Sequence, residues 1–231
     1  MMFCFVGMNW TFLTALVSGS PANTIWLQNL APAWVMIATV VFFRERPSVR
    51  DWMMMTTCIT GVLFLVAMEF ANGKDLVGYE WWSPILAVLS GLLYAGVIFT
   101  MKAMRRHDSA WLIALNHIAT AVVMLPLVLW SGVSMPSGSM WLLLAGIGMF
   151  QMGLPYLLFA KGLRTTPSHL ASLITLLEPV LLPVWVHFTR MGDPTYQSPR
   201  WWTWVGASFI LLGLTIRYAW PSSNAKKELE I

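Results

Sequence analysis

Glu178 is the residue of this sequence whose type and position are best suited to chemistry. It lies in the apolar run from Leu170 to Phe188 and is followed directly by Pro179. Eight residues into a helix correspond to about 12 Å, near the core of a hydrocarbon layer about 30 Å thick. An ionised carboxylate is costly there, so it faces a cavity or a partner. We interpret Glu178 as a substrate-binding or proton-exchanging group; the alternative is a protonated or paired carboxyl that only ties helices together.

Pro179 adds a backbone feature to the same stretch. Proline has no N–H, so the carbonyl four residues earlier loses its helical donor. We therefore expect the carbonyl of Thr175 to be free to bind something other than the helix.

Other polar side chains also fall inside apolar runs. Asn9 and Tyr156 are 147 residues apart, which is the spacing of an internal repeat described below. For each polar group at this depth, a hydrogen bond between helices is the alternative to substrate contact. With Glu178, the predicted substrate-binding residues are Asn9, Trp10, Gln28, Asn29, Asn116 and Tyr156.

Catalytic and metal-binding signatures are not found. The sequence has no G-x-S-x-G, H-E-x-x-H or C-x-x-C motif. We predict no enzyme activity, no catalytic residue, no metal site and no cofactor.

Composition indicates which structure must position these residues. The chain has 231 residues, of which 58% are hydrophobic and 10% charged, whereas a soluble domain carries about 25% charged residues. The net charge of +4 comes from short basic clusters between apolar runs, which encode membrane topology and do not indicate nucleic-acid binding. We predict an all-α, polytopic membrane helix bundle.

The apolar runs are long enough for about eight transmembrane helices. A spanning helix needs about 20 apolar residues. The runs are Met1–Val17, Ala22–Phe43, Trp52–Met68, Trp81–Met101, Ala110–Trp130, Met140–Ala160, His169–Phe188 and Trp201–Ala219.

Basic residues are distributed unevenly between the two sides that eight spans define. Of the 14 Lys and Arg residues, eleven fall on one side, and Lys74, Arg190 and Arg200 fall on the other. The positive-inside rule assigns the richer side to the cytoplasm. We predict an integral protein of the plasma (inner) membrane with both termini in the cytoplasm.

The sequence contains an internal repeat. Leu16–Ala67 resembles Leu163–Ala219, with Leu30-Ala31-Pro32 matching Leu177-Glu178-Pro179 at an offset of 147. The two copies cross the membrane in opposite directions, so they form inverted repeats, which place a substrate site near the midplane between them.

These motifs resemble the EamA-type family of the drug/metabolite transporter superfamily. The first copy carries Ser18-Gly19-Ser20-Pro21, Leu30-Ala31-Pro32, Glu45 and Gly61; the second carries Thr165-Thr166-Pro167, Leu177-Glu178-Pro179, Gly192 and Gly213. Two positions depart from the family pattern: Arg44 stands where glycine is usual, and Asp193 stands where glutamate is usual.

The resemblance implies an organisation and a function. Family members have ten helices, five per repeat, so residues 1–70 would be the last three helices of the first repeat. Residues 81–220 would form the second repeat and residues 221–231 a cytoplasmic tail. On this reading the chain begins two helices into the pattern. The resemblance implies a secondary carrier or exporter of small organic metabolites such as amino acids, working by alternating access through a central cavity.

Several alternatives stay open. The expected partners are a small-molecule substrate and the lipid bilayer, with no nucleic acid; proton coupling and a homodimer are undecided. A sugar-phosphate or nucleotide-sugar carrier would require cations facing the cavity, for which Lys102 and Lys161 are the borderline cases. A further alternative is a truncated membrane remnant or scaffold that does not transport.

Overall fold

The computed structural model describes residues 1–19, 21–42, 44, 46–72, 80–132, 135–190 and 200–218. The expectations for Glu45, Lys74, Gly192, Asp193 and the tail 221–231 fall outside these residues.

All regular structure in the described part is helical. Five helical stretches are long and apolar enough to cross a membrane: Thr24–Val41, Val49–Met68, Ser83–Ala103, Ser109–Trp130 and Ser139–Gly162. Three shorter apolar helices are Met2–Ser18, Ser168–Leu181 and Trp201–Ile216. They occupy the eight apolar runs of the sequence, so the predicted all-α membrane fold is confirmed.

Twelve helical segments make up these stretches in the described part. They are α1 (Met2–Ser18), α2 (Pro21–Gln28), α3 (Ala31–Val41), α4 (Val49–Asn72), α5 (Ser83–Ala103), α6 (Ser109–Trp130), α7 (Ser139–Gly146), η1 (Ile147–Gly153), α8 (Leu154–Gly162), α9 (Ser168–Ile174), α10 (Leu177–Arg190) and α11 (Trp201–Tyr218).

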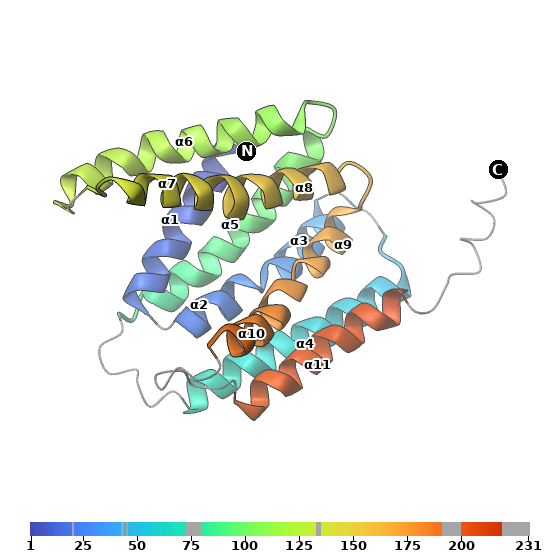
Figure 1. Cartoon of the computed structure of the whole chain (residues 1–231). Helices are drawn as coiled ribbons and strands as arrows, with labels where there is room; N and C mark the ends of the chain where they lie inside the picture. The colour runs from blue at the N-terminus through green and yellow to red at the C-terminus, as the bar shows by residue number, and fades with distance from the viewer. Residues whose placement is uncertain are drawn as a thin grey trace.

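The helices form three layers in Figure 1. α6 and the α7–α8 stretch lie at the top, α1, α5, α2 and α3 form the middle, and α4 and α11 lie side by side at the bottom. The short helix α9 contacts α3, α5 and α4. The loops before α4, α6 and α9 lie at one end, on the right of the view. This end carries the exposed residues Arg44, Arg46, Arg105, Arg106 and Arg164 and is called the basic end.

Two of the predicted spans are interrupted at matching places. In the first, Asn29 N–H donates to the Ile25 carbonyl and Leu30 N–H to the Leu27 carbonyl. In the second, the same two bonds run from Thr175 to Ala171 and from Leu176 to Leu173. Each residue of the second set lies 146 positions after its counterpart in the first. Pro32 and Pro179 follow the breaks closely, and proline cannot donate the hydrogen bond that would continue the preceding helix.

The break corrects the expectation for the Thr175 carbonyl. This oxygen is not free: it accepts a hydrogen bond of 3.1 Å from Glu178 N–H. A helical carbonyl at this position would pair with the N–H four residues later, which Pro179 lacks. The tight turn brings the N–H three residues later to the oxygen in its place.

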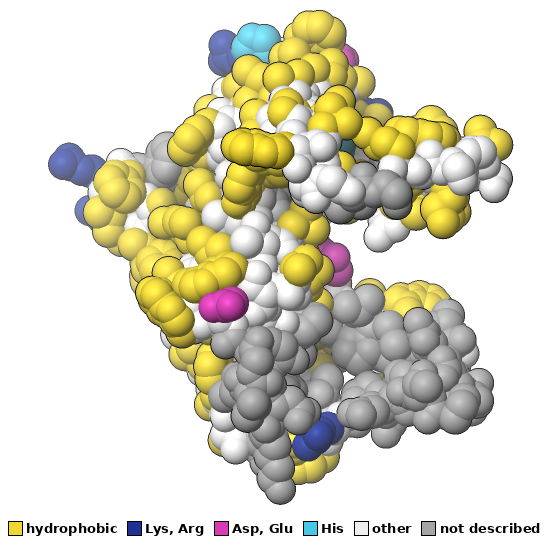
Figure 2. Space-filling view, turned by 90° about the vertical axis from the view of Figure 1, so that its left-hand side faces the viewer, with side chains coloured by type: hydrophobic (Ala, Val, Ile, Leu, Met, Phe, Trp, Pro, Cys, Tyr) yellow, Lys and Arg dark blue, Asp and Glu magenta, His cyan; other side chains and the backbone are white. Residues whose placement is uncertain are grey.

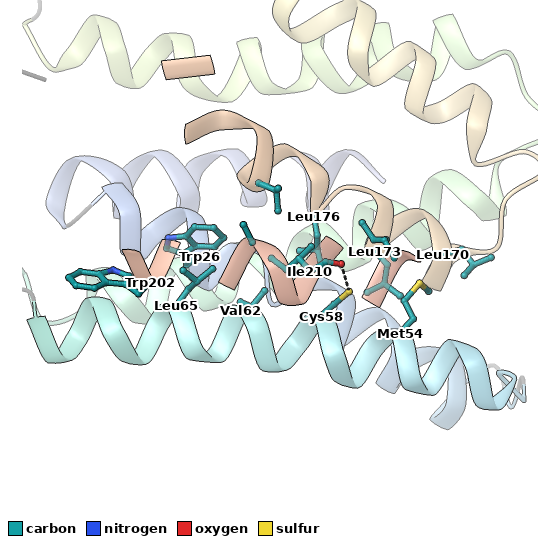
Figure 3. Close-up of a cluster of buried hydrophobic side chains, with 13 residues drawn as sticks. Trp26, Met54, Cys58, Val62, Leu65, Leu170, Leu173, Leu176, Trp202 and Ile210 are labelled. Carbon is teal, nitrogen blue, oxygen red and sulfur yellow. Dashed lines mark hydrogen bonds between the residues drawn. The ribbon is translucent and has the colours of Figure 1, made fainter. Parts of the chain in front are cut away.

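α4 and α11 pack with their backbones close together because small residues lie between them. A Cβ on Gly213 would lie 2.6 Å from Cys58 Sγ, and one on Gly206 would overlap Leu65. The two contacts are related by the repeat. An offset of 148 matches Cys58 to Gly206 and Leu65 to Gly213, so the Cys58–Gly213 contact corresponds to the Leu65–Gly206 contact. Figure 3 shows the surrounding apolar cluster, in which Cys58 donates to the Ile210 carbonyl at 3.5 Å.

The stretch from α7 to α8 includes the π-helical turn η1. Leu154 N–H donates to the Met149 carbonyl, five residues earlier. Pro155 has no N–H for the carbonyl of Gln151, and the wider turn absorbs this loss. No residue of α7 or η1 is buried, and their exposed side chains are mainly apolar, as lipid-facing surfaces are.

Candidate substrate-binding site

Glu178 lies in the first turn of α10, directly after the break that follows α9. Its side chain is exposed in this structure, although it lies within the second interrupted span. The break therefore brings a carboxylate to an accessible surface at membrane depth. An ionised carboxylate only accepts hydrogen bonds, so it suits a cationic or hydrogen-bond-donating group.

Tyrosine side chains from two other helices lie in the neighbourhood of this carboxylate. Tyr94 of α5 lies close to the side chain of Thr175, and both Tyr94 and Tyr156 of α8 lie within electrostatic range of Glu178. Thr175 also donates through its hydroxyl to the Ser172 carbonyl at 2.7 Å. The site thus combines groups from α5, α8 and the α9–α10 break.

An aromatic cluster holds Tyr156 in place. Its ring lies 5.1 Å from the ring of Phe5 and 5.9 Å from that of His117, both edge-on, and Phe5 and His117 are 5.3 Å apart. His117 Nδ1 bonds to the Ile113 carbonyl of its own helix at 2.9 Å. α1, α6 and α8 therefore meet at one side of the candidate site.

Asn116 is a buried polar residue whose side chain has no hydrogen bond in the described part of the chain. Its side chain is 0% exposed, and neither its oxygen nor its nitrogen has a hydrogen-bond partner in the described part of the chain. Such a group usually has a partner. It precedes His117, which places it on α6 close to the aromatic cluster.

The other predicted residues have mainly local contacts. Asn9 donates to the Phe5 carbonyl and Asn29 to the Ile25 carbonyl, each at 2.8 Å and within one helical segment or its last turn. These bonds are not the interhelical ones that the alternative interpretation expected. Gln28 is half-buried, and its carbonyl lies against Gly91 of α5, one turn from Tyr94. Trp10 is 40% exposed.

The structure thus brings Glu178 together with Tyr156, whereas no contact joins Asn9, Trp10, Gln28 or Asn29 to Glu178 in the described residues. Sequence reasoning missed Tyr94 and Phe5, and for Thr175 it considered the carbonyl but not the side chain. A signal for Tyr94 existed: it is a hydroxyl-bearing residue inside an apolar run, between Gly91 and Gly96.

The surface of the molecule has a hollow between the layers of helices described above. Figure 2 looks onto the end opposite the basic end and shows the surface hollowed beneath the upper layer, which contains α6 and α7. The combination of interrupted helices, an accessible carboxylate and a hollow is typical of membrane carriers.

Comparison of the sequence with models of protein families identifies the class of protein. The model of the EamA-like transporter family matches residues 1–67 and 81–218. The chain belongs to the EamA-like transporter family. It is therefore a membrane transporter and not an enzyme.

Two similar proteins agree with this assignment. A relative from Archaeoglobus fulgidus, described as an uncharacterized transporter, is 28% identical over 211 residues, covering 91% of this chain and 71% of the relative. A crystal structure described only as that of a protein aligns with a TM-score of 0.72 at 16% identity, covering 98% of this chain and 75% of the other. This second likeness bears on the fold alone.

Proposed function

We propose that this EamA-like transporter is a secondary carrier or exporter of small organic metabolites that contain an amino group, such as amino acids. The observation that carries the proposal is the exposed Glu178 carboxylate beside Tyr94 and Tyr156 at a helix break. A carboxylate pairs with an ammonium group, and tyrosine rings attract cations through their faces.

The two segments with matching breaks are proposed to be inverted repeats, residues 1–70 and 81–220. Their support is the hydrogen-bond pattern that recurs after 146 residues and the α4–α11 contacts that an offset of 148 exchanges. Alternating access between these halves would expose Glu178 to each side in turn. The distribution of basic residues favours a plasma-membrane protein with the basic end in the cytoplasm.

A phosphate-bearing substrate fits the site less well. Lys102 donates to the Thr166 carbonyl at 2.6 Å, beside the basic end, and Lys161 is exposed in the last turn of α8. Among the described residues, no Lys or Arg side chain forms an ion pair with Glu178, so a carrier of sugar phosphates or nucleotide sugars is the weaker candidate.

The test is uptake into proteoliposomes of a panel of radiolabelled amino acids, with wild-type protein and Glu178→Gln. The substitution keeps the volume of the side chain but removes its charge and its proton exchange. We expect normal insertion and loss of most transport. Glu80→Gln is the matched control, because Glu80 is an exposed acid in the loop before α5.

The outcomes separate the alternatives. Wild-type rates and unchanged pH dependence for Glu178→Gln, at equal protein per vesicle, would refute the role of this carboxylate. Absence of transport by the wild type across amino acids, sugar phosphates and nucleotide sugars would favour a scaffold.

A further inference from the structure

The buried pair Asp51–His169 lies at the basic end and joins the two proposed repeats. His169 Nε2 is 3.7 Å from Asp51 Oδ2, close enough for an ion pair when the imidazole is protonated. Asp51 is 5% exposed and His169 is 8% exposed. Asp51 lies in the first turn of α4 and His169 at the start of α9. Charged groups are rarely buried unless they are paired, so the contact holds the two helices together.

α9 is the part of the chain that separates the Glu178 site from the basic end. It spans seven residues, or about 10 Å. Five consecutive residues of α9 are buried: His169, Leu170, Ala171, Ser172 and Leu173. A helix that is buried on all sides leaves no path along its length. Figure 3 shows Leu170 and Leu173 near Met54 of α4, in the same apolar cluster.

Two other polar contacts near the start of α9 lie within the second proposed repeat. Lys102 Nζ donates to the Thr166 carbonyl at 2.6 Å, and the Arg164 guanidinium donates to the His107 carbonyl at 2.9 Å. They attach the loop before α9 to α5 and to the loop after α5. The Asp51–His169 pair, in contrast, attaches α9 to the first proposed repeat.

The sequence repeat does not reproduce this pair at the matching positions. The offsets of 147 and 148 place Ala22 opposite His169 and Pro199 opposite Asp51. Neither alanine nor proline has a side chain that can form an ion pair. The sequence thus has the chemistry for a charged contact at Asp51 and His169, whereas the repeat-equivalent residues do not.

We propose that Asp51 and His169 form the gate at the basic end of this transporter, and that the structure shows this gate closed. The pair holds α9 against α4 while the site is accessible from the opposite end. Its separation releases α9 and opens the basic end, which makes both residues positioning residues of the transport cycle. The inference uses alternating access from the proposed function but does not depend on the proposed substrate.

The test measures the accessibility of two single cysteines in full-length protein lacking Cys4 and Cys58. The first reporter is Ser172→Cys, at a buried position one turn into α9 from His169. The second is Glu178→Cys, at the accessible site. A membrane-impermeant maleimide is applied from the basic end or from the opposite end, in vesicles of defined orientation.

His169→Ala and Asp51→Asn each break the pair from a different side. We expect each to raise labelling of the Ser172→Cys reporter from the basic end by about tenfold, the change produced by about 1.4 kcal/mol in a conformational equilibrium. Labelling of the Glu178→Cys reporter from the opposite end should fall in the same proteins, because alternating access exposes one side at a time.

Ser48→Ala is the matched control. The Ser48 hydroxyl and backbone N–H both donate to Asp51 Oδ2, at 2.7 and 2.9 Å, and the hydroxyl accepts from Asp51 N–H at 3.2 Å. This variant weakens the start of α4 but keeps the Asp51–His169 pair, so it should change neither reporter. Equal effects of Ser48→Ala and His169→Ala would mean local fraying and would overturn the gate.

Two further outcomes also refute the proposal. One is unchanged labelling of both reporters in His169→Ala and Asp51→Asn. The other is increased labelling from the basic end with no decrease from the opposite end. The labelling of neither reporter requires transport of a substrate. A failure of the proposed gate can therefore be distinguished from a failure of the proposed substrate.

Discussion

Replacing Gly91 by alanine should separate α2 from α5 at the first helix break. A Cβ at Gly91 would lie 2.7 Å from the backbone oxygen of Gln28, the last residue of α2. Ordinary contact begins at 3.4 Å, so one of the backbones must move by about 0.7 Å. A backbone oxygen cannot rotate away as a side chain can, and the break that follows Gln28 would move with it.

The expected cost follows from this geometry. Overpacking of a close-packed interior costs about 1–3 kcal/mol, and alanine returns about 0.5–1 kcal/mol of helix propensity. The net loss is about 0–2.5 kcal/mol in the free energy of unfolding, with a midpoint of about 1 kcal/mol. For a chain of this size, each kcal/mol lowers the melting temperature by about 2–4 °C.

The assay is thermal unfolding in detergent, followed with a thiol-reactive dye, since Cys58 is buried in the folded protein. Two alanine variants serve as controls. Gly146→Ala adds a Cβ with nothing within 4 Å and should leave the melting temperature unchanged or raise it. Gly96→Ala would approach the Cys4 sulfur at 2.9 Å, and that side chain can turn away, so the loss should be smaller. The reasoning is refuted if Gly91→Ala melts at the same temperature as Gly146→Ala.

Three further predictions concern the site, the loop before α4 and the topology. Tyr94→Phe removes a hydroxyl that lies close to Thr175, while Thr175 keeps its bond to the Ser172 carbonyl, so the free energy of unfolding should fall by no more than about 0.5–1.5 kcal/mol. The value of kcat/KM for transport should nevertheless fall several-fold, and a wild-type value would remove Tyr94 from the site. Arg44 has φ of 52°, in the left-handed region that costs a residue with a Cβ about 1–2 kcal/mol. Arg44→Gly should therefore raise the melting temperature by several degrees, whereas Arg44→Ala, which also loses the charge, should not. Equal shifts of the two variants would show that the loss of charge, and not the relief of backbone strain, changes the melting temperature. Finally, in a cysteine-free background on intact cells, an impermeant maleimide should label Ser137→Cys and not Arg105→Cys, and the reverse pattern would invert the proposed orientation.

The backbone conformation of Arg44 explains why the family pattern has glycine at this position. Glycine adopts a left-handed backbone without steric cost, so the usual glycine suits the φ found here. The sequence showed that Arg44 replaces glycine but contained no information on φ. The structure supplies the physical reason why glycine is favoured at this position.

The positions of the spans could be predicted because hydrocarbon thickness fixes the length of an apolar run. The breaks inside two of these spans were harder to predict. Proline marked their neighbourhood, yet the residue that takes up the lost hydrogen bond depends on how the turn closes. Glu178 N–H reaches the Thr175 carbonyl only because the chain tightens there.

The candidate site was partly predictable, because the membrane also restricts where charged residues occur. A charge at membrane depth is costly, so Glu178 stands out in the sequence. Tyrosine is common both in packed cores and in binding sites, and Tyr94 meets Thr175 only through the packing of α5 against α9. No local pattern in the sequence contains that contact.

The two halves differ by one residue in the spacing between break and proline. The hydrogen bonds of the breaks repeat after 146 residues, but the Leu-x-Pro motifs repeat after 147. The second half therefore has one more residue between its break and its proline. One residue turns a helical side chain by about 100°. Ala31, which the motif matches to Glu178, is 1% exposed, whereas Glu178 is exposed. At the offset of the hydrogen bonds, the counterpart of Glu178 is Pro32, which is buried like Ala31. The exposure of Glu178 therefore depends on what packs beside α10 and not on the additional residue.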